Sequence, residues 1–273
     1  MNKTVKVCFS IRKNLGNALN PILIERVLGK KVIWADEYNC QTSGIGSGLR
    51  LFYRARHKID YNKIIANDFP CQIWSAGFLS TPNDDIVPIR EFNIASVRGE
   101  LSKAFLEKLY NKKMPISTGD AGLLASELLT GNLGNKKYKL GIIPHDRERE
   151  EHHFIDIHNN NSNSIIINVQ DDPMDIIKTM SMCDCIISSS LHGLIVADSL
   201  GIPNRWVKLT DNPLGDAFKF HDYYSTFGIK TNALDINDIF HIRCDRIIDD
   251  YRITQEMVDT KKQDIISAFS LYL

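Results

Sequence analysis

The stretch from Cys185 to Trp206 constrains the fold more than any other part of the chain. It opens with a short apolar run, passes through three consecutive serines, Ser188–Ser190, and then takes up a helical pattern with His192 in its first turn. Such a run bounded by small polar residues predicts a buried parallel strand. Serines here can cap the following helix, whose free N–H groups bind anions. We therefore expect an acid/base group and an anion site at one strand end, where ligands bind in open α/β sheets.

Apolar runs alternate with helical patterns along the rest of the chain. A helix is expected from about Asn20 to Leu28, and the apolar stripe of Leu101, Phe105 and Leu109 predicts another. Strands that alternate with helices predict parallel sheets covered on both faces. The candidate strands are residues 5–9, 31–34, 72–74, 93–97, 139–143, 164–169, 184–188 and 205–208.

A segment rich in Gly and Asn, Thr130–Lys137, has no periodicity and is the expected linker between domains. The fold class expected is α/β, with Rossmann-like domains at residues 1–132 and 138–273 and a terminal helix at 254–271. A cleft between the two domains would hold the active site. Periodicity alone also permits one continuous sheet.

Composition narrows the class of protein. The formal net charge is zero, so a nucleic-acid partner is not expected. No apolar stretch approaches the roughly 20 residues that span a bilayer, and the N-terminal apolar run is too short for a signal peptide. Six cysteines without an export signal indicate reduced thiols and a cytoplasmic location. Cys183 and Cys185 are interpreted as small buried hydrophobes and His152-His153 as a solvated loop or helix face, so no metal is expected.

Residues 185–206 also resemble the polysaccharide pyruvyl transferase family. Four further blocks agree with it in family order: Gly16–Ile24, Ala95–Ser102, Leu140–His145 and Phe218–Tyr224. The resemblance implies the two-domain architecture called GT-B, with the acceptor on the first domain and phosphoenolpyruvate on the second. It implies a transferase of exopolysaccharide or capsule synthesis that places pyruvate as a ketal on two sugar hydroxyls.

Ketal formation from phosphoenolpyruvate sets the chemical demands on such a site. A general acid must protonate the enol methylene carbon, a base must accept hydroxyl protons, and cationic or N–H groups must hold carboxylate and phosphate. No redox cofactor is needed and no metal is obligatory. The expected partners are phosphoenolpyruvate and a glycan or lipid-linked oligosaccharide, with peripheral contact at the cytoplasmic membrane face.

Position and resemblance together select the candidate site residues. The catalytic candidates are His192 and His145, the donor-binding candidates are Arg98, Ser189, Ser190, Leu191, Arg205 and Lys219, and the acceptor-binding candidates are Asn17 and Asn20. Each has a structural alternative. His192 or His145 can shape a loop, Arg98 can be a surface residue paired with Glu100, and Lys219 can belong to an aromatic core cluster. Asn17 and Asn20 can cap a helix, and capping is favoured for Asn20.

The chain departs from the family pattern at Ser190. Many members carry arginine immediately before the Leu-His-Gly step, so a cation is missing here. Arg98, Arg205 or Lys219 would have to supply it. A catalytically silent protein that binds sugar or phosphate therefore stays open as a function. A GT-B glycosyltransferase that uses a nucleotide sugar also stays open, because the same helix N-terminus could hold a diphosphate.

Overall fold

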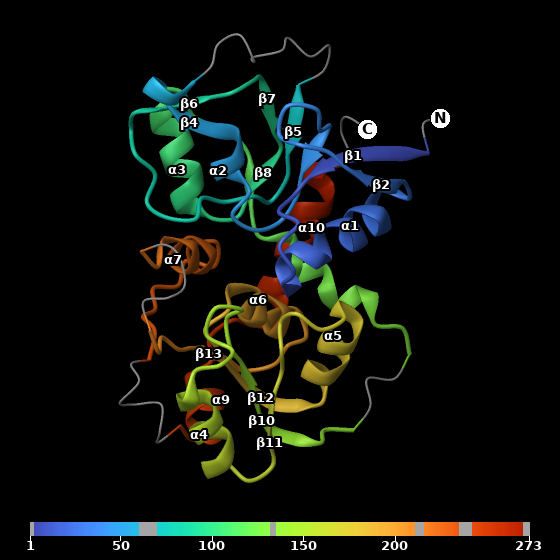
Figure 1. Cartoon of the computed structure of the whole chain (residues 1–273), viewed down its shortest axis with the longest axis vertical. Helices are drawn as coiled ribbons and strands as arrows, with labels where there is room; N and C mark the ends of the chain where they lie inside the picture. The colour runs from blue at the N-terminus through green and yellow to red at the C-terminus, as the bar shows by residue number, and fades with distance from the viewer. Residues whose placement is uncertain (1–2, 60–69, 132–134, 211–215, 235–241, 270–273) are drawn as a thin grey trace.

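Two parallel sheets organise the molecule (Figure 1). The computed structural model describes residues 3–59, 70–131, 135–210, 216–234 and 242–269. The first sheet has the order β2-β1-β3-β5-β7 and the second the order β11-β10-β12-β13. The first comprises β1 Thr4–Cys8, β2 Lys31–Trp34, β3 Thr42–Ser43, β5 Cys71–Ile73 and β7 Phe92–Ile94. The second comprises β10 Tyr138–Ile143, β11 Ser164–Ile166, β12 Cys183–Ser188 and β13 Asn204–Trp206.

Every neighbouring pair within these two sheets is parallel, as the alternating pattern predicted. The strand expected at residues 93–97 is divided into β7 and β8, Ser96–Val97, which pairs with β9, Ser117–Thr118. A small antiparallel pair, β4 Tyr53–Ala55 and β6 Ile86–Pro88, lies beside the first sheet. The α/β class is therefore confirmed.

Helices pack against both sheets. They are α1 Leu15–Leu28, α2 Leu49–Phe52, η1 Arg56–Lys58, α3 Glu100–Leu109, η3 Ala121–Leu128, α4 His152–Asn160, α5 Pro173–Ser181, α6 Leu191–Ser199, α7 Phe218–Ser225, α9 Cys244–Asp250 and α10 Gln255–Phe269. None of the helices in the described ranges is both long and apolar enough to cross a bilayer.

Helix α1 begins five residues before its expected start. Its N-cap is Asn14, whose Oδ1 accepts the Asn17 N–H at 3.0 Å. The interpretation of Asn20 as a cap is therefore wrong: Asn20 is buried inside the helix, and its Nδ2 donates to the Gly16 carbonyl. Pro21 explains the error, because proline favours the first turn of a helix but here sits in the middle of one.

A continuous core joins the two sheets through the helices between them. Val7 and Trp74 of the first half share one apolar cluster with Ile186 of the second. The chain also crosses back: α10 packs against the first half, where Trp74 stacks on Phe269 at 4.1 Å and donates its Nε1–H to the Ile265 carbonyl. The terminal helix thus contributes to the half of the molecule farther from it in sequence. Residues 132–134 of the expected linker and 270–271 of the expected helix lie outside the described residues.

Candidate functional site

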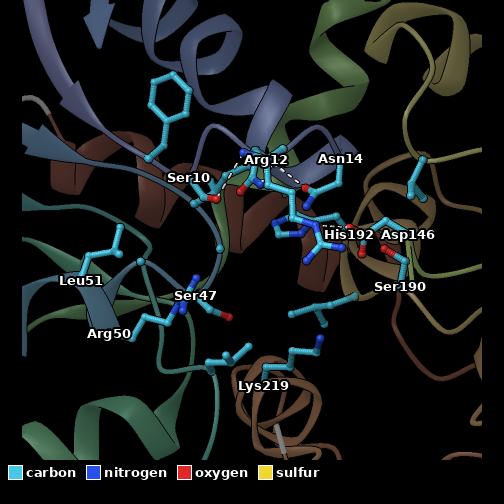
Figure 2. Close-up of a pocket in the computed structure, with 18 of the residues that line it drawn as sticks. Ser10, Arg12, Asn14, Ser47, Arg50, Leu51, Asp146, Ser190, His192 and Lys219 are labelled. Atoms are coloured by element: carbon cyan, nitrogen blue, oxygen red, sulfur yellow. Dashed lines mark hydrogen bonds and ion pairs between the residues drawn. The ribbon is translucent and has the colours of Figure 1, made fainter. Parts of the chain in front are cut away.

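A cavity of about 150 Å³ lies where the carboxyl ends of strands from the two sheets approach each other (Figure 2). Its walls come from the loop after β1, the loop after β3, the loop after β10, the start of α6, and Lys219 of α7. Ligands of open α/β sheets bind at this edge because the polar loops and helix N-termini gather there. The described lining residues that carry its polar character are Ser10, Arg12, Asn14, Asn17, Ser43, Ser47, Arg50, His145, Asp146, Arg147, Ser190, His192 and Lys219.

His192 stands at the second position of α6 with its ring enclosed by glycines. A Cβ on Gly16 would lie 2.2 Å from the His192 Nδ1, and Gly46 and Gly122 also approach the ring. Nε2 lies 3.9 Å from Asp120 Oδ1. It is buried and makes no hydrogen bond with any residue of the described ranges. The ring is thus held by packing, and its Nε2 has no hydrogen-bond partner among the described residues.

The surroundings of His192 favour the neutral imidazole. Burial lowers its pKa most, and the charges of Arg98 and Lys219 lower it further, while the carboxylate of Asp120 acts in the opposite direction. An anion bound in the cavity would reverse this balance, because a nearby negative charge stabilises imidazolium.

The three serines before α6 shape the turn. Ser188 Oγ accepts the Ser190 N–H at 2.9 Å, and Ser189 Oγ accepts the His145 N–H at 2.9 Å. Ser190 is the N-cap residue of α6, but its hydroxyl makes no capping hydrogen bond. The expected side-chain capping is therefore wrong. The first turn of α6 has no side-chain cap and borders the cavity through Ser190 and Leu191, an arrangement suited to anions.

Asp146 connects His145 with Arg12. Its Oδ1 lies 2.8 Å from His145 Nδ1 and its Oδ2 lies 2.6 Å from Arg12 Nε. The Arg147 N–H also points at the same Nδ1, at 3.2 Å. These two contacts require opposite tautomers of the neutral ring: the Arg147 N–H needs a proton-free Nδ1, whereas a hydrogen bond to Asp146 needs a proton on Nδ1.

His145 is neutral at physiological pH in this setting. Burial lowers its pKa to about 4, assisted by Lys219, Arg12 and Arg147 and opposed by Asp146. A neutral imidazole oriented by a carboxylate can accept a proton from a hydroxyl group.

Cations outnumber carboxylates around the cavity. Arg12, Arg50, Arg147 and Lys219 line it, and Asp146 is the one carboxylate among the described lining residues. Lys219 is nine-tenths buried and its Nζ lies 5.2 Å from the ring centre of Phe220. Burial, aided by Arg98, lowers its pKa to about 8. Within the described chain its ammonium group has no ion pair or hydrogen bond, so this charge is available to an anionic ligand.

Six of the ten residues expected in the site line the cavity, and four do not. The structure brings together His192, His145, Ser190, Leu191, Lys219 and Asn17. Ser189 and Asn20 lie behind its walls, where they bind His145 and Gly16. Arg205 lines a separate cavity and donates to Thr231 Oγ1 at 3.3 Å.

Arg98 is also absent from the cavity wall. Its guanidinium is fully buried and pairs with Asp222 of α7 at 2.9 Å. The alternative of a surface arginine paired with Glu100 is therefore wrong, because the partner comes from a helix more than a hundred residues away in sequence.

Sequence reasoning missed Arg12, Arg50, Asp120, Asp146 and Arg147. These residues lie in loops or short helices, where no periodicity marks them. A signal existed for two of them: Arg12 and Asp146 each follow a predicted strand by a few residues, and parallel strands converge at their carboxyl ends.

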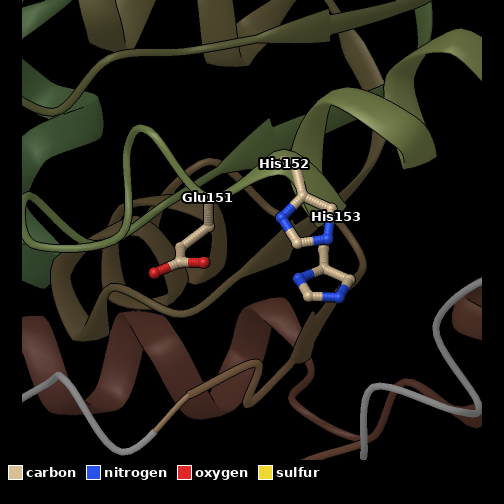
Figure 3. Close-up of side chains that lie close together, drawn as sticks. All are labelled: Glu151, His152 and His153. Atoms are coloured by element: carbon tan, nitrogen blue, oxygen red, sulfur yellow. The ribbon is translucent and has the colours of Figure 1, made fainter.

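One group among the described residues has the composition of a metal site. The ligand atoms of Glu151, His152 and His153 at the start of α4 lie within 4.8 Å of one another (Figure 3). The two imidazole rings face each other, however, with centres 3.8 Å apart and planes 34° apart. Nitrogen lone pairs lie in the ring planes, so facing rings do not aim them at a common ion. His152 is exposed, whereas His153 is half-buried with its Nδ1 shielded from solvent, so the interpretation of the pair as a solvated helix face holds for His152 only.

These features define a class: an α/β protein with a cationic, histidine-bearing cavity between two parallel sheets. Comparison with known proteins is more specific. The family profile described as polysaccharide pyruvyl transferase matches residues 66–210, more than half of the chain. The chain belongs to the polysaccharide pyruvyl transferase family. It is also similar to the protein named "Uncharacterized protein L143" of Acanthamoeba polyphaga mimivirus, with 28% identity over 268 residues, 93% of this chain and 86% of that one.

Proposed function

We propose that the protein is a ketal pyruvyl transferase that takes the enolpyruvyl group from phosphoenolpyruvate. The acceptor would be two hydroxyls of a sugar in a surface polysaccharide or its lipid-linked precursor. One observation carries the proposal: two histidines, each facing a carboxylate, share a cationic cavity with a helix N-terminus that has no side-chain cap. Phosphoenolpyruvate carries a phosphate and a carboxylate, which need such cationic and N–H groups.

The reaction balances without any further reactant. One sugar hydroxyl adds to the central carbon of the donor while a proton adds to the methylene carbon, which becomes the methyl group. Phosphate then leaves, and the second hydroxyl closes the ketal at the same carbon. Of the two hydroxyl protons, one in net terms is in the new methyl group and the other leaves with phosphate, so neither redox cofactor nor metal is required.

In this scheme His192 is the general acid. The donor's charges, held by Lys219 and the first turn of α6, would raise the pKa of His192 and protonate it when substrate is present. His145 is the base for the sugar hydroxyl, since its depressed pKa keeps it neutral and Asp146 orients it.

Three of the four expected residues outside the cavity act through others in this proposal. Ser189 holds the backbone of His145, and Arg98 holds α7, which carries Lys219. Asn20 packs against Gly44 in the loop after β3. Asn17 lines the cavity from α1 and is the proposed acceptor contact. Arg205 has no role in the proposed reaction.

The two-domain GT-B arrangement is part of the proposal. Residues 1–132 would carry the acceptor and residues 138–273 the donor, with the cavity at their junction. The cytoplasmic location and peripheral membrane contact belong to the same proposal, since a lipid-linked acceptor would lie at the membrane surface.

A nucleotide-sugar glycosyltransferase would use the same helix N-terminus for a diphosphate. The position of Asp198, the acidic residue of that helix, is not compatible with this function. It is fully buried and accepts hydrogen bonds from Tyr223, Tyr251 and Asn204, so it cannot reach a ribose or a leaving group.

A donor panel tests the proposal. Purified protein is incubated with phosphoenolpyruvate or nucleotide sugars, with and without a panel of bacterial-type glycans. We expect phosphate release from phosphoenolpyruvate only with a suitable glycan, whose mass then rises by one pyruvate less one water. Sugar transfer from a nucleotide sugar would contradict the proposal.

A further inference from the structure

Arg12 reaches across the cavity from one half of the molecule to the other. It lies in the loop between β1 and α1, and its Nε lies 2.6 Å from Asp146 Oδ2 in the loop after β10 (Figure 2). The two partners differ in their exposure: the Arg12 side chain is 48% exposed and that of Asp146 is 2% exposed. A buried carboxylate therefore holds a guanidinium whose outer part faces the cavity.

The loop that carries Arg12 is itself fixed. Asn17 Nδ2 donates to the Arg12 carbonyl at 2.6 Å, and the Arg12 N–H points at Ser10 Oγ, 3.4 Å away. Asn14 in the same loop caps α1. The backbone hydrogen bonds and the ion pair at Nε restrict the guanidinium before any ligand arrives, which lowers the entropic cost of binding.

The terminal Nη1 and Nη2 groups of Arg12 make no hydrogen bond with the described residues of the chain. They are the two groups of a guanidinium that together form a fork for carboxylate or phosphate oxygens. The contact of Arg12 with Asp146 is made at Nε, and Asp146 is shared with His145. Lys219 and Arg147 line the same cavity, so the Asp146 carboxylate does not neutralise all of the positive charge there.

We infer that Arg12 is a ligand of the donor anion, that Asp146 positions it, and that it supplies the cation absent at Ser190. This inference rests on the proposed donor, phosphoenolpyruvate. Ser190 lines the same cavity at the start of α6 and offers a hydroxyl where the family pattern has a guanidinium. An arginine from the opposite wall serves the same anion from the other side.

The first test is donor affinity, measured by calorimetry with phosphoenolpyruvate and separately with inorganic phosphate. Arg12→Ala should weaken phosphoenolpyruvate binding about 10- to 100-fold, the usual effect of losing hydrogen bonds to a charged group. Arg12→Lys should recover part of this loss, because an ammonium keeps the charge without the fork. Lys13→Ala is the matched control, since Lys13 is exposed, adjacent and absent from the cavity wall. It should bind like the parent.

The second test moves the guanidinium to the other wall. The double variant Arg12→Ala/Ser190→Arg should regain at least about tenfold of the lost affinity, and Asp146→Asn should weaken binding less than Arg12→Ala does. Melting curves establish that each variant is folded. If the double variant does not regain affinity, Arg12 does not supply the cation that is absent at Ser190.

Failure of this inference differs from failure of the proposed function. A parent that binds phosphate but not phosphoenolpyruvate contradicts the proposed donor, and the loss of phosphate binding in Arg12→Ala would still support the anion site. Equal affinities of parent and Arg12→Ala for both probes would overturn the role of Arg12. Binding of neither probe by the parent would contradict both.

Discussion

Arg98 and Asp222 form an ion pair that solvent does not reach, with 2.9 Å between Nη2 and Oδ2 and no exposed surface on either side chain. The same carboxylate accepts the Ser102 N–H at 2.8 Å and the Ser102 hydroxyl at 2.7 Å. This cluster joins the start of α3 to α7. It therefore fixes the helix that brings Lys219 to the cavity, although Arg98 does not reach the cavity itself.

Removal of the Arg98 side chain should destabilise the fold. Arg98→Ala leaves the Asp222 carboxylate buried without its cation, and breaking such a pair costs about 3–5 kcal/mol. Urea unfolding measures the change in the free energy of unfolding. Arg56→Ala, which breaks an exposed pair with Asp85, should change it by less than about 1 kcal/mol. Equal effects of the two variants would contradict the structural role of Arg98.

Donor affinity should depend on the charge of Lys219. The pKa of this residue is lowered to about 8 in the empty cavity, so the ammonium group loses its charge as pH rises through 8. Phosphoenolpyruvate affinity of the parent should therefore fall between about pH 7 and 9. The Lys219→Arg variant stays charged over this range, so its phosphoenolpyruvate affinity should not show this fall. Calorimetric titrations at several pH values compare the two proteins, and identical profiles would rule out Lys219 as the titrating group.

His145 should make the protein sensitive to mild acid. Its pKa is about 4 in the folded state and about 6.5 in an unfolded chain, so between these values the unfolded state binds a proton that the native state does not. This contribution to stability is fully present above pH 6.5 and is lost as pH falls toward 4.

The comparison of parent with His145→Gln isolates this effect from that of the carboxylates. Between pH 7 and 4.5 the parent should lose about 2 kcal/mol more unfolding free energy than the variant. Chemical denaturation at both pH values measures it. A loss of the same size in both proteins would show that His145 is not held neutral.

Packing of Gly16 against His192 predicts a steric effect on catalysis. An added Cβ would lie 2.2 Å from the imidazole Nδ1, so the ring must move. Gly16→Ala should lower the rate of phosphate release about tenfold or more, since small displacements of a catalytic group are costly. Ala18→Ser in the same helix, outside the cavity wall, is the control. A Gly16→Ala protein with parental turnover would show that the ring position is not critical.

The sequence predicts those parts of this molecule that follow from local patterns. Parallel strands alternate with helices, and His192 follows a buried strand, so the sheets and the edge that carries the site are both predictable. The Arg98–Asp222 pair is not, because its partners come from distant segments with no shared pattern. Pro21 misplaces the start of α1, and Arg12 lies in a loop whose direction depends on tertiary hydrogen bonds.

The same distinction applies to the site. The histidines and Lys219 are predictable because each lies in a block that resembles the family. Asp146, which holds both His145 and Arg12, lies directly after His145 in sequence, but its role depends on a contact between the two halves. The charge balance of the cavity is thus a property of the assembled fold.

The most direct test of the account is the rate of phosphate release from phosphoenolpyruvate with an accepted glycan, in the parent and in His192→Gln. Loss of a general acid should lower turnover about 10²- to 10⁴-fold, while donor affinity and melting temperature stay close to those of the parent. A folded His192→Gln protein that binds donor and releases phosphate at the parental rate would contradict the assignment of His192 as the proton donor.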